Sequence, residues 1–164
     1  MPPKGAGPRT RPSTRCLGEA PSAVTAPRIF TLEEAEATLP LVRRIAGDLS
    51  AEFDGWRHAV GDYEVLAAAA TSRDGESVEL LAARERVSEH ARRVSAFLQE
   101  LDALGCVFKG FEEGLVDFYT LRDDRLVFLC WRLGEPRIAH WHEVDDGFAG
   151  RRPVDDRILT ETAR

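Results

Sequence analysis

Apolar residues recur at alternating intervals of three and four across residues 32–63, and this spacing constrains the fold more than any other feature of the sequence. Residues spaced in this way form one continuous stripe along an α-helix. A strict heptad repeat also favours packing against a second long helix at a shallow angle, as in a coiled coil. The stripe comprises Leu32, Ala35, Leu39, Val42, Ala46, Leu49, Phe53, Trp56, Val60 and Tyr63.

The start of this helix is marked by Thr31, which Glu34 follows three positions later. This pair is typical of a capping box, in which the hydroxyl and the carboxylate satisfy backbone amides that the first helical turn leaves unpaired. Pro40 cannot donate a hydrogen bond to the carbonyl of Glu36. The sequence therefore predicts a helix from about Leu32 that either kinks at Pro40 or begins with a separate short helix.

A second helix with the same spacing is predicted after the turn signal at residues 71–75, and Gly105 ends it. His90 lies on its apolar stripe, so a hydrogen-bonded core histidine is expected there, whereas His58 lies off the first stripe and is expected at the surface. The two helices form a long antiparallel hairpin, which we expect to project from the domain or to pair with another copy. The second stripe comprises Leu80, Ala83, Val87, His90, Val94, Phe97, Leu101 and Leu104.

Beyond Gly105 the apolar pattern changes from helical to alternating, which indicates β-strands. The alternating segments lie at residues 106–108, 115–121, 126–132 and 137–143. They predict an antiparallel meander of three or four strands, covered on one face by the helical hairpin. The predicted fold class is therefore α+β.

The register of these strands brings the polar side chains together. A tight turn at Asp123 and Asp124 pairs Asp117 with Cys130. If the next turn has three residues, Cys130 faces His140, and His142 follows on the same side. A turn of two or four residues would move both histidines to the opposite face.

Imidazole, thiolate and carboxylate groups gathered on one face suit a transition metal, and zinc or ferrous iron are the candidates. The candidate ligands are Asp117, Cys130, His140 and His142. Three further residues are candidates for side chains that surround the ligands: Glu143, Asp145 and Arg151. The two acids among them would orient the imidazole N–H groups. The alternative is a structural network in which Cys130 is a small buried apolar residue.

Composition and charge argue against several classes of function. The chain has 164 residues and a formal net charge of −6, so its overall field does not attract nucleic acid or anionic membranes. No apolar stretch is long enough for a membrane span, and three cysteines do not form a disulfide framework. We expect a cytoplasmic protein with a basic, proline-rich tail at residues 1–27, one domain at 28–153 and a C-terminal tail at 154–164.

Five segments resemble the bacterial domain of unknown function 2203 family, and the resemblance extends over residues 28–153. Its motif positions include Asp117, Cys130, His142, Asp145 and Arg151, but not His140. The resemblance implies a small cytosolic bacterial protein and assigns no reaction. The five segments are residues 30–35, 104–107, 114–118, 129–135 and 141–151.

Two hypotheses of function follow from the sequence. The first is a metal-binding protein whose site lies on the sheet, with no reaction assigned, because the sequence contains no phosphate-binding loop and no nucleophile elbow. The second is a non-enzymatic interaction or self-association module built on the helical hairpin.

Overall fold

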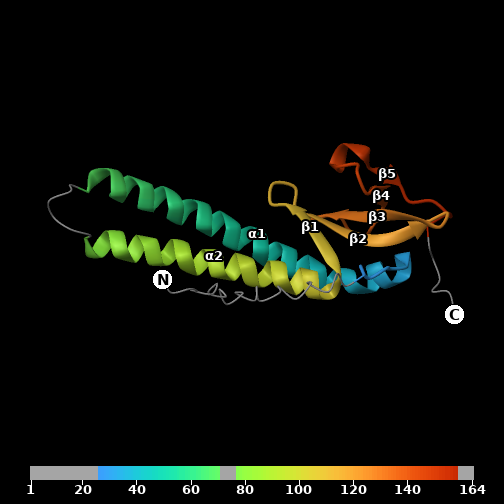
Figure 1. The fold of residues 1–164 in the computed structure, drawn as a ribbon, viewed down its shortest axis with the longest axis horizontal. Coiled ribbons are helices and arrows are strands. Elements are labelled where there is room, and N and C mark those ends of the chain that lie inside the picture. Colours follow the sequence, from blue (N-terminus) through green and yellow to red (C-terminus); the bar gives the residue numbers. More distant parts are fainter. Residues whose placement is uncertain (1–25, 71–76, 159–164) are drawn as a thin grey trace, which may run out of the picture.

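The computed structural model describes residues 26–70 and 77–158. Along the chain, two helices are followed by the strands of one sheet. Figure 1 shows that one end of the long helical hairpin lies beside the strands. This is the predicted α+β class. The elements are α1 (Leu32–Ala69), α2 (Val78–Leu104), β1 (Cys106–Gly110), β2 (Leu115–Arg122), β3 (Arg125–Arg132), β4 (His140–Glu143), a 3₁₀ turn η1 (Phe148–Gly150) and β5 (Arg152–Pro153).

The ends of the two helices follow the sequence signals. The hydroxyl of Thr31 accepts from the Glu34 amide at 3.0 Å, and the Glu34 carboxylate accepts from the Thr31 amide at 2.9 Å, which confirms the capping box. α1 is one continuous helix that contains Pro40, rather than two helices. α2 ends at Gly105, whose φ of 89° is the left-handed conformation that favours glycine. The predicted turn at residues 71–75 lies outside the described residues.

Burial along α1 changes at the point where the helix leaves the sheet. The stripe residues from Ala35 to Leu49 are buried, whereas those from Phe53 to Tyr63 are only half-buried. His90 on α2 is also half-buried, and its Nδ1 lies 2.7 Å from the Glu52 carboxylate. The hairpin therefore has a base packed on the sheet and a projecting part that packs mainly on itself (Figure 1).

The sheet is antiparallel throughout, in the order β1-β2-β3-β4-β5. It contains five strands rather than three or four, because the two residues of β5 pair with β4. A two-residue turn joins β2 to β3, and Asp123 and Asp124 adopt φ values of 49° and 60° there. These values are typical of a type I′ hairpin, whose twist matches that of the strands it joins.

Residues 154–158, which the sequence places in a C-terminal tail, pack against the sheet. The Val154 amide donates to the Ala139 carbonyl at 3.0 Å. Ile158 is buried in the core and bridges to Arg122. The ordered structure thus continues beyond residue 153.

The hydrophobic core lies between the base of the hairpin and one face of the sheet. Val116 and Phe118 of β2 and Leu129 and Trp131 of β3 are fully buried on this face. Because side chains alternate along a strand, residues between them point to the other face.

Among the described residues, neither helix is apolar enough over a sufficient length to cross a membrane.

Candidate metal centre

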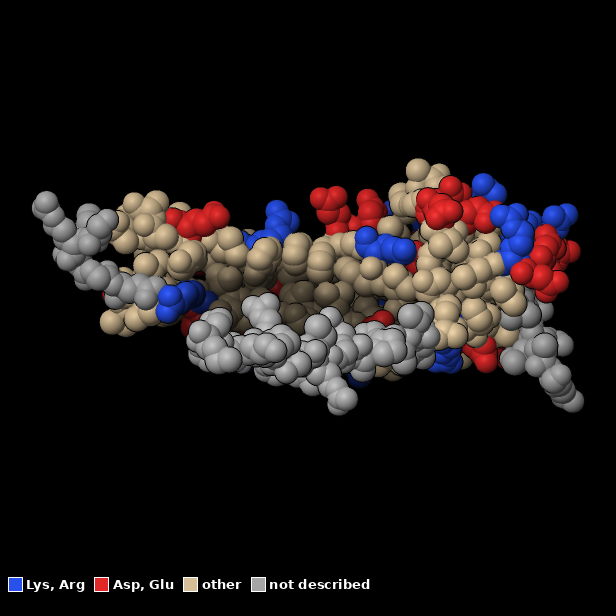
Figure 2. Space-filling view, in the orientation of Figure 1, with Lys and Arg blue, Asp and Glu red and all other residues tan. Residues whose placement is uncertain are grey.

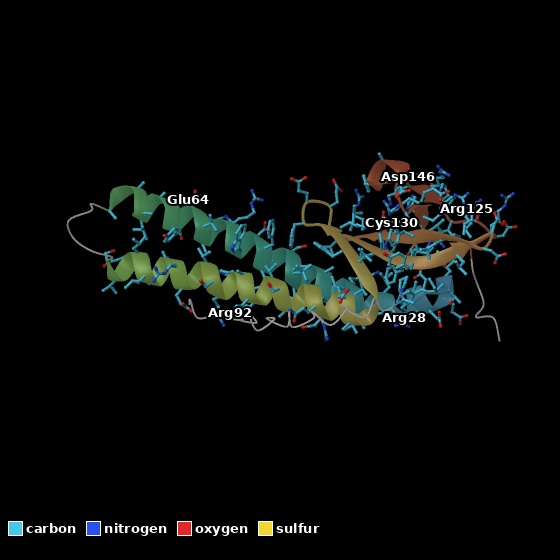
Figure 3. The ribbon with its side chains drawn as sticks, in the orientation of Figure 1. Arg28, Glu64, Arg92, Arg125, Cys130 and Asp146 are labelled. Carbon is cyan, nitrogen blue, oxygen red and sulfur yellow. The ribbon has the colours of Figure 1, made fainter. Side chains whose placement is uncertain are left out.

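Three ligand-type side chains meet on the sheet face that points away from the core. Asp117 of β2 pairs directly with Cys130 of β3, and His142 of β4 pairs with Phe128, two residues before Cys130. One ligand atom from each of the three side chains lies within 4.8 Å of the other two. Their exposed fractions are 1% for Asp117, 0% for Cys130 and 3% for His142, and Figure 3 labels Cys130 within the sheet.

The closest pair of these ligand atoms has about the spacing that one metal ion imposes, whereas separations of up to 4.8 Å within the group would have to shorten on binding. Ligand lengths of about 2.0 to 2.3 Å around a tetrahedral ion place two ligand atoms about 3.3 to 3.8 Å apart. The distance between His142 Nε2 and Asp117 Oδ2 is 3.2 Å. Asp117 Oδ1 is buried and has no hydrogen-bond partner among the described residues. A buried carboxylate oxygen without a partner is costly, and a cation would satisfy it.

The imidazole of His142 faces an acceptor at each ring nitrogen. Nδ1 lies 2.7 Å from the backbone carbonyl oxygen of Glu143, and Nε2 lies 3.2 Å from the Asp117 carboxylate. A carbonyl only accepts, so Nδ1 must donate its proton there. The hydrogen bond to Asp117 raises the pKa of His142 above its ordinary value despite the opposing effect of burial. Without a metal, the imidazolium form satisfies both acceptors, because each ring nitrogen then donates a proton. With a metal, Nε2 is unprotonated and offers its lone pair to the ion.

The thiol of Cys130 is held in its protonated form. Burial, followed by the negative charge of Asp117, raises its pKa well above the ordinary value. The cation of Arg151 acts in the opposite direction and favours the thiolate. An unligated Cys130 is consequently a poor nucleophile, and it becomes a thiolate only if a cation replaces its proton.

His140 is the candidate ligand that the structure does not bring into this group. It pairs directly with Cys130 across the β3–β4 ladder, as a three-residue turn would place it, although the connection between the strands is longer. Its side chain lines a different pocket, together with Glu36 of α1 and Ile138. The Nδ1 atom of His140 is buried and has no hydrogen-bond partner among the described residues.

Two of the residues expected to surround the ligands, Glu143 and Arg151, contact the site in different ways. Glu143 supports His142 through its backbone carbonyl, while its carboxylate contacts Arg125 at 3.3 Å. Arg151 reaches the carbonyl of Cys130 at 3.3 Å and forms a short ion pair of 2.6 Å with Glu135. Arg151 thus ties the segment after η1 to the strand that carries the thiol.

A pocket of about 440 Å³ opens onto two of the three ligands. Asp117 and His142 belong to its lining, and Cys130 lies behind them. Lys109 of β1 was not among the sequence candidates, yet it lines this pocket, and its ammonium lies 4.7 Å from the centre of the Phe128 ring. Val107 pairs with Asp117, so alternation along β1 is the signal that would have placed Lys109 on this face. The remaining lining residues are Leu115, Val144, Asp145, Asp146, Gly147 and Phe148.

The fold and the site define an α+β protein with a helical hairpin and a buried Asp/Cys/His group on its sheet. The chain belongs to the family described as uncharacterized conserved protein (DUF2203), whose sequence model matches residues 28–154. This match confirms the resemblance drawn from the motifs. No curated protein and no solved structure is significantly similar to the chain.

Proposed function

We propose that the protein binds a transition-metal ion through Asp117, Cys130 and His142, with zinc or ferrous iron as the candidates. The observation that carries this proposal is the gathering of a carboxylate, a thiol and an imidazole within 4.8 Å of one another in a buried site. Mixed nitrogen, oxygen and sulfur ligands are those that such borderline-soft ions prefer. The unpartnered Asp117 Oδ1 supports the same conclusion.

Support for His142 comes from the hydrogen bond at its far side. Because Nδ1 donates to the Glu143 carbonyl, the ring is oriented with Nε2 toward Asp117 and Cys130. A carbonyl that accepts a hydrogen bond from the other ring nitrogen commonly fixes the tautomer of a metal-bound histidine. Metal binding would replace the Nε2 proton and the thiol proton, so it should release protons to solvent.

Three protein ligands leave one position of a tetrahedral ion open. The pocket that Asp117 and His142 line gives solvent a route to that position. Open sites of this type hold a water molecule, which the ion acidifies, whereas purely structural zinc sites have four protein ligands. The proposal therefore includes an accessible metal, and it assigns no reaction to it.

The test is metal analysis of purified protein after incubation with Zn²⁺ or Co²⁺ and removal of the excess. We expect about one ion per chain in the wild type, and a sulfur-to-cobalt absorption band for the Co²⁺ form. Cys130→Ser and His142→Ala should each lose the ion, and Cys130→Ser should also lose the band. His140→Ala is the matched control, because His140 lies outside the group, and it should keep the ion.

Two results would overturn the proposal. One is a folded wild type that takes up neither ion; the other is a wild type whose metal content is unchanged by Cys130→Ser and His142→Ala. Circular dichroism of each variant separates loss of the ion from loss of the fold.

A second candidate function, self-association, is favoured by the projecting part of the hairpin. The apolar stripe of α1 continues for several turns beyond the buried base, where its residues are only half-buried. A helix pair whose apolar stripe is only partly buried along its length is suited to packing against further helices. This function does not depend on the metal centre.

A further inference from the structure

The projecting part of the hairpin, residues 53–69 of α1 and 78–94 of α2, is called the arm below. Its apolar stripe on α1 consists of Phe53, Trp56, Val60 and Tyr63, which continue the spacing of the buried residues nearer the base. The ring of Phe53 stacks on Phe111, in the turn between β1 and β2, with centroids 3.8 Å apart. The stripe therefore points toward the side of the hairpin on which the sheet lies.

Beyond this contact the stripe loses the cover that the sheet gives at the base. Trp56 still stacks on Phe53, with ring centroids 5.6 Å apart, but Trp56, Val60 and Tyr63 all remain half-buried. Val87 on the facing helix is half-buried as well, whereas Val94, nearer the base, packs against the core. Figure 1 shows the arm extending past the strands, so the sheet does not cover this length of the stripe.

The arm buries little for its length. Within its described residues only Ala59, Leu80 and Ala83 are buried, and two of these three side chains are single methyl groups. Helices in proteins derive most of their stability from packing of the apolar face rather than from intrinsic propensity. Two regular helices with so little buried surface need additional packing along the stripe to offset the entropy of ordering them.

We propose that a second copy of this chain covers the stripe, with the two arms packed antiparallel as a four-helix bundle about a twofold axis. The stripe is a suitable partner for itself, because a twofold axis brings the same apolar residues of two copies together. The arm contains helical segments of equal length, residues 53–69 and 78–94, so two arms can overlap fully in this arrangement. This inference rests on the second candidate function and specifies the surface and the arrangement through which the two copies pack.

Size and charge are compatible with a second copy. An arm about 25 Å long and two helices wide presents a face of about 500 Å², so two copies would bury about 1,000 Å², which is the size of a weak dimer interface. Charged groups of the arm already pair within one chain, as in Arg93 with Glu89 at 3.0 Å and Arg92 with Glu85 at 3.3 Å. Figure 2 shows the Lys, Arg, Asp and Glu side chains more densely gathered over the sheet than over the hairpin.

The test compares two identical substitutions on one helix. Val60→Glu places a charge on the stripe, whereas Val65→Glu places the same charge about 140° around the helix, at a side chain that is 71% exposed. Sedimentation velocity and light scattering would give the mass of the full chain between about 5 and 200 µM, a range that covers weak dimers of this size. We expect a dimer for the wild type and for Val65→Glu.

Val60→Glu should weaken dimer formation about tenfold or more, because association would bury an unpaired charge. Since Val60 is half-buried within its own chain, the melting curve of this variant must show that it remains folded. Val60→Ala is the second variant; it removes apolar surface without adding charge and should weaken the dimer by a smaller factor.

A wild type that is monomeric over the whole concentration range would overturn the proposal. So would a dimer that Val60→Glu and Val65→Glu affect equally, because the interface would then lie elsewhere. Measuring the metal content of the same samples keeps the two proposed functions distinguishable: a metal-loaded monomer retains the first and rejects the second, and a metal-free dimer does the reverse.

Discussion

At the scale of single residues, the Glu135 carboxylate shows burial and hydrogen bonding acting against each other. Burial alone would raise its pKa, but hydrogen bonds from Arg151 and from the Arg132 amide outweigh burial and lower it. A carboxyl group whose pKa is lower in the folded state stabilises the fold above its unfolded pKa of about 4.3. That contribution is lost as the pH falls through the folded pKa.

Glu135→Gln should therefore reduce the free energy of unfolding at pH 7 by about 2 kcal/mol, and the difference from the wild type should shrink below about pH 4. Urea unfolding at several pH values measures both effects. Glu113→Gln is the control, because Glu113 is about half-exposed and lies 3.5 Å from Arg132; it should change stability by less than about 0.5 kcal/mol. A constant difference at all pH values would contradict this account of Glu135.

Asp117 supplies a second prediction at this scale, for protein kept metal-free with a chelator. Asp117→Asn removes the negative charge that faces His142, whose ring is nearly fully buried. Without that charge the ring can release its Nε2 proton and accept a hydrogen bond from the asparagine amide, so urea unfolding at neutral pH should show a loss of about 1 kcal/mol. Asp145→Asn, at an exposed residue that lines the same pocket, should have little effect.

At the scale of elements, the hairpin turn between β2 and β3 sets the register of the site. Asp123 and Asp124 both adopt positive φ, which costs an L-residue more than it costs glycine. Asp124→Gly should raise the free energy of unfolding by about 0.5 to 1 kcal/mol, and Asp124→Val should lower it by about 1 to 2 kcal/mol. Thermal unfolding measures both; equal stability of the two variants would show that the turn is not strained.

Local chemical signals explain why much of the element order was predictable. Thr31 and Glu34 mark the start of α1, and Gly105 marks the end of α2, because each satisfies backbone groups within a few residues. Register across β2 and β3 follows from the two-residue turn, so the pairing of Asp117 with Cys130 was predictable as well. The five-strand count was not, since β5 has two residues, too few to show an alternating pattern.

The candidate site was only partly predictable, because it depends on non-local geometry. The sequence could not show that the ring of His142 reaches Asp117 while the ring of His140 lines another pocket, although both lie on one strand. Alternation places Lys109 on the same face as Val107, but it was missed because only the pairing of Val107 with Asp117 shows that this is the face of the site. Periodicity assigns residues to a face, but the contacts among side chains on that face follow from strand twist and neighbouring loops.

At the scale of the whole molecule, the uneven distribution of burial predicts uneven stability. Val116, Phe118, Leu129 and Trp131 in the sheet are fully buried, whereas the described residues of the arm bury only one leucine and two alanines. Local opening costs least where few apolar contacts must be broken. We therefore expect amide hydrogen exchange to be slowest in β2 and β3 and faster in the arm, as measured by mass spectrometry on peptides from each region.

The same measurement links the two ends of the molecule, because a second copy that covers the stripe would protect the arm by mass action. Exchange around Val60 should then slow as the protein concentration rises, while exchange in β2 and β3 should stay the same. Loading the metal should have the opposite pattern, slowing exchange near Cys130 and leaving the arm unchanged. If concentration and metal altered both regions together, the sheet and the arm would be a single cooperative unit, and the separation of functions argued from burial would be wrong.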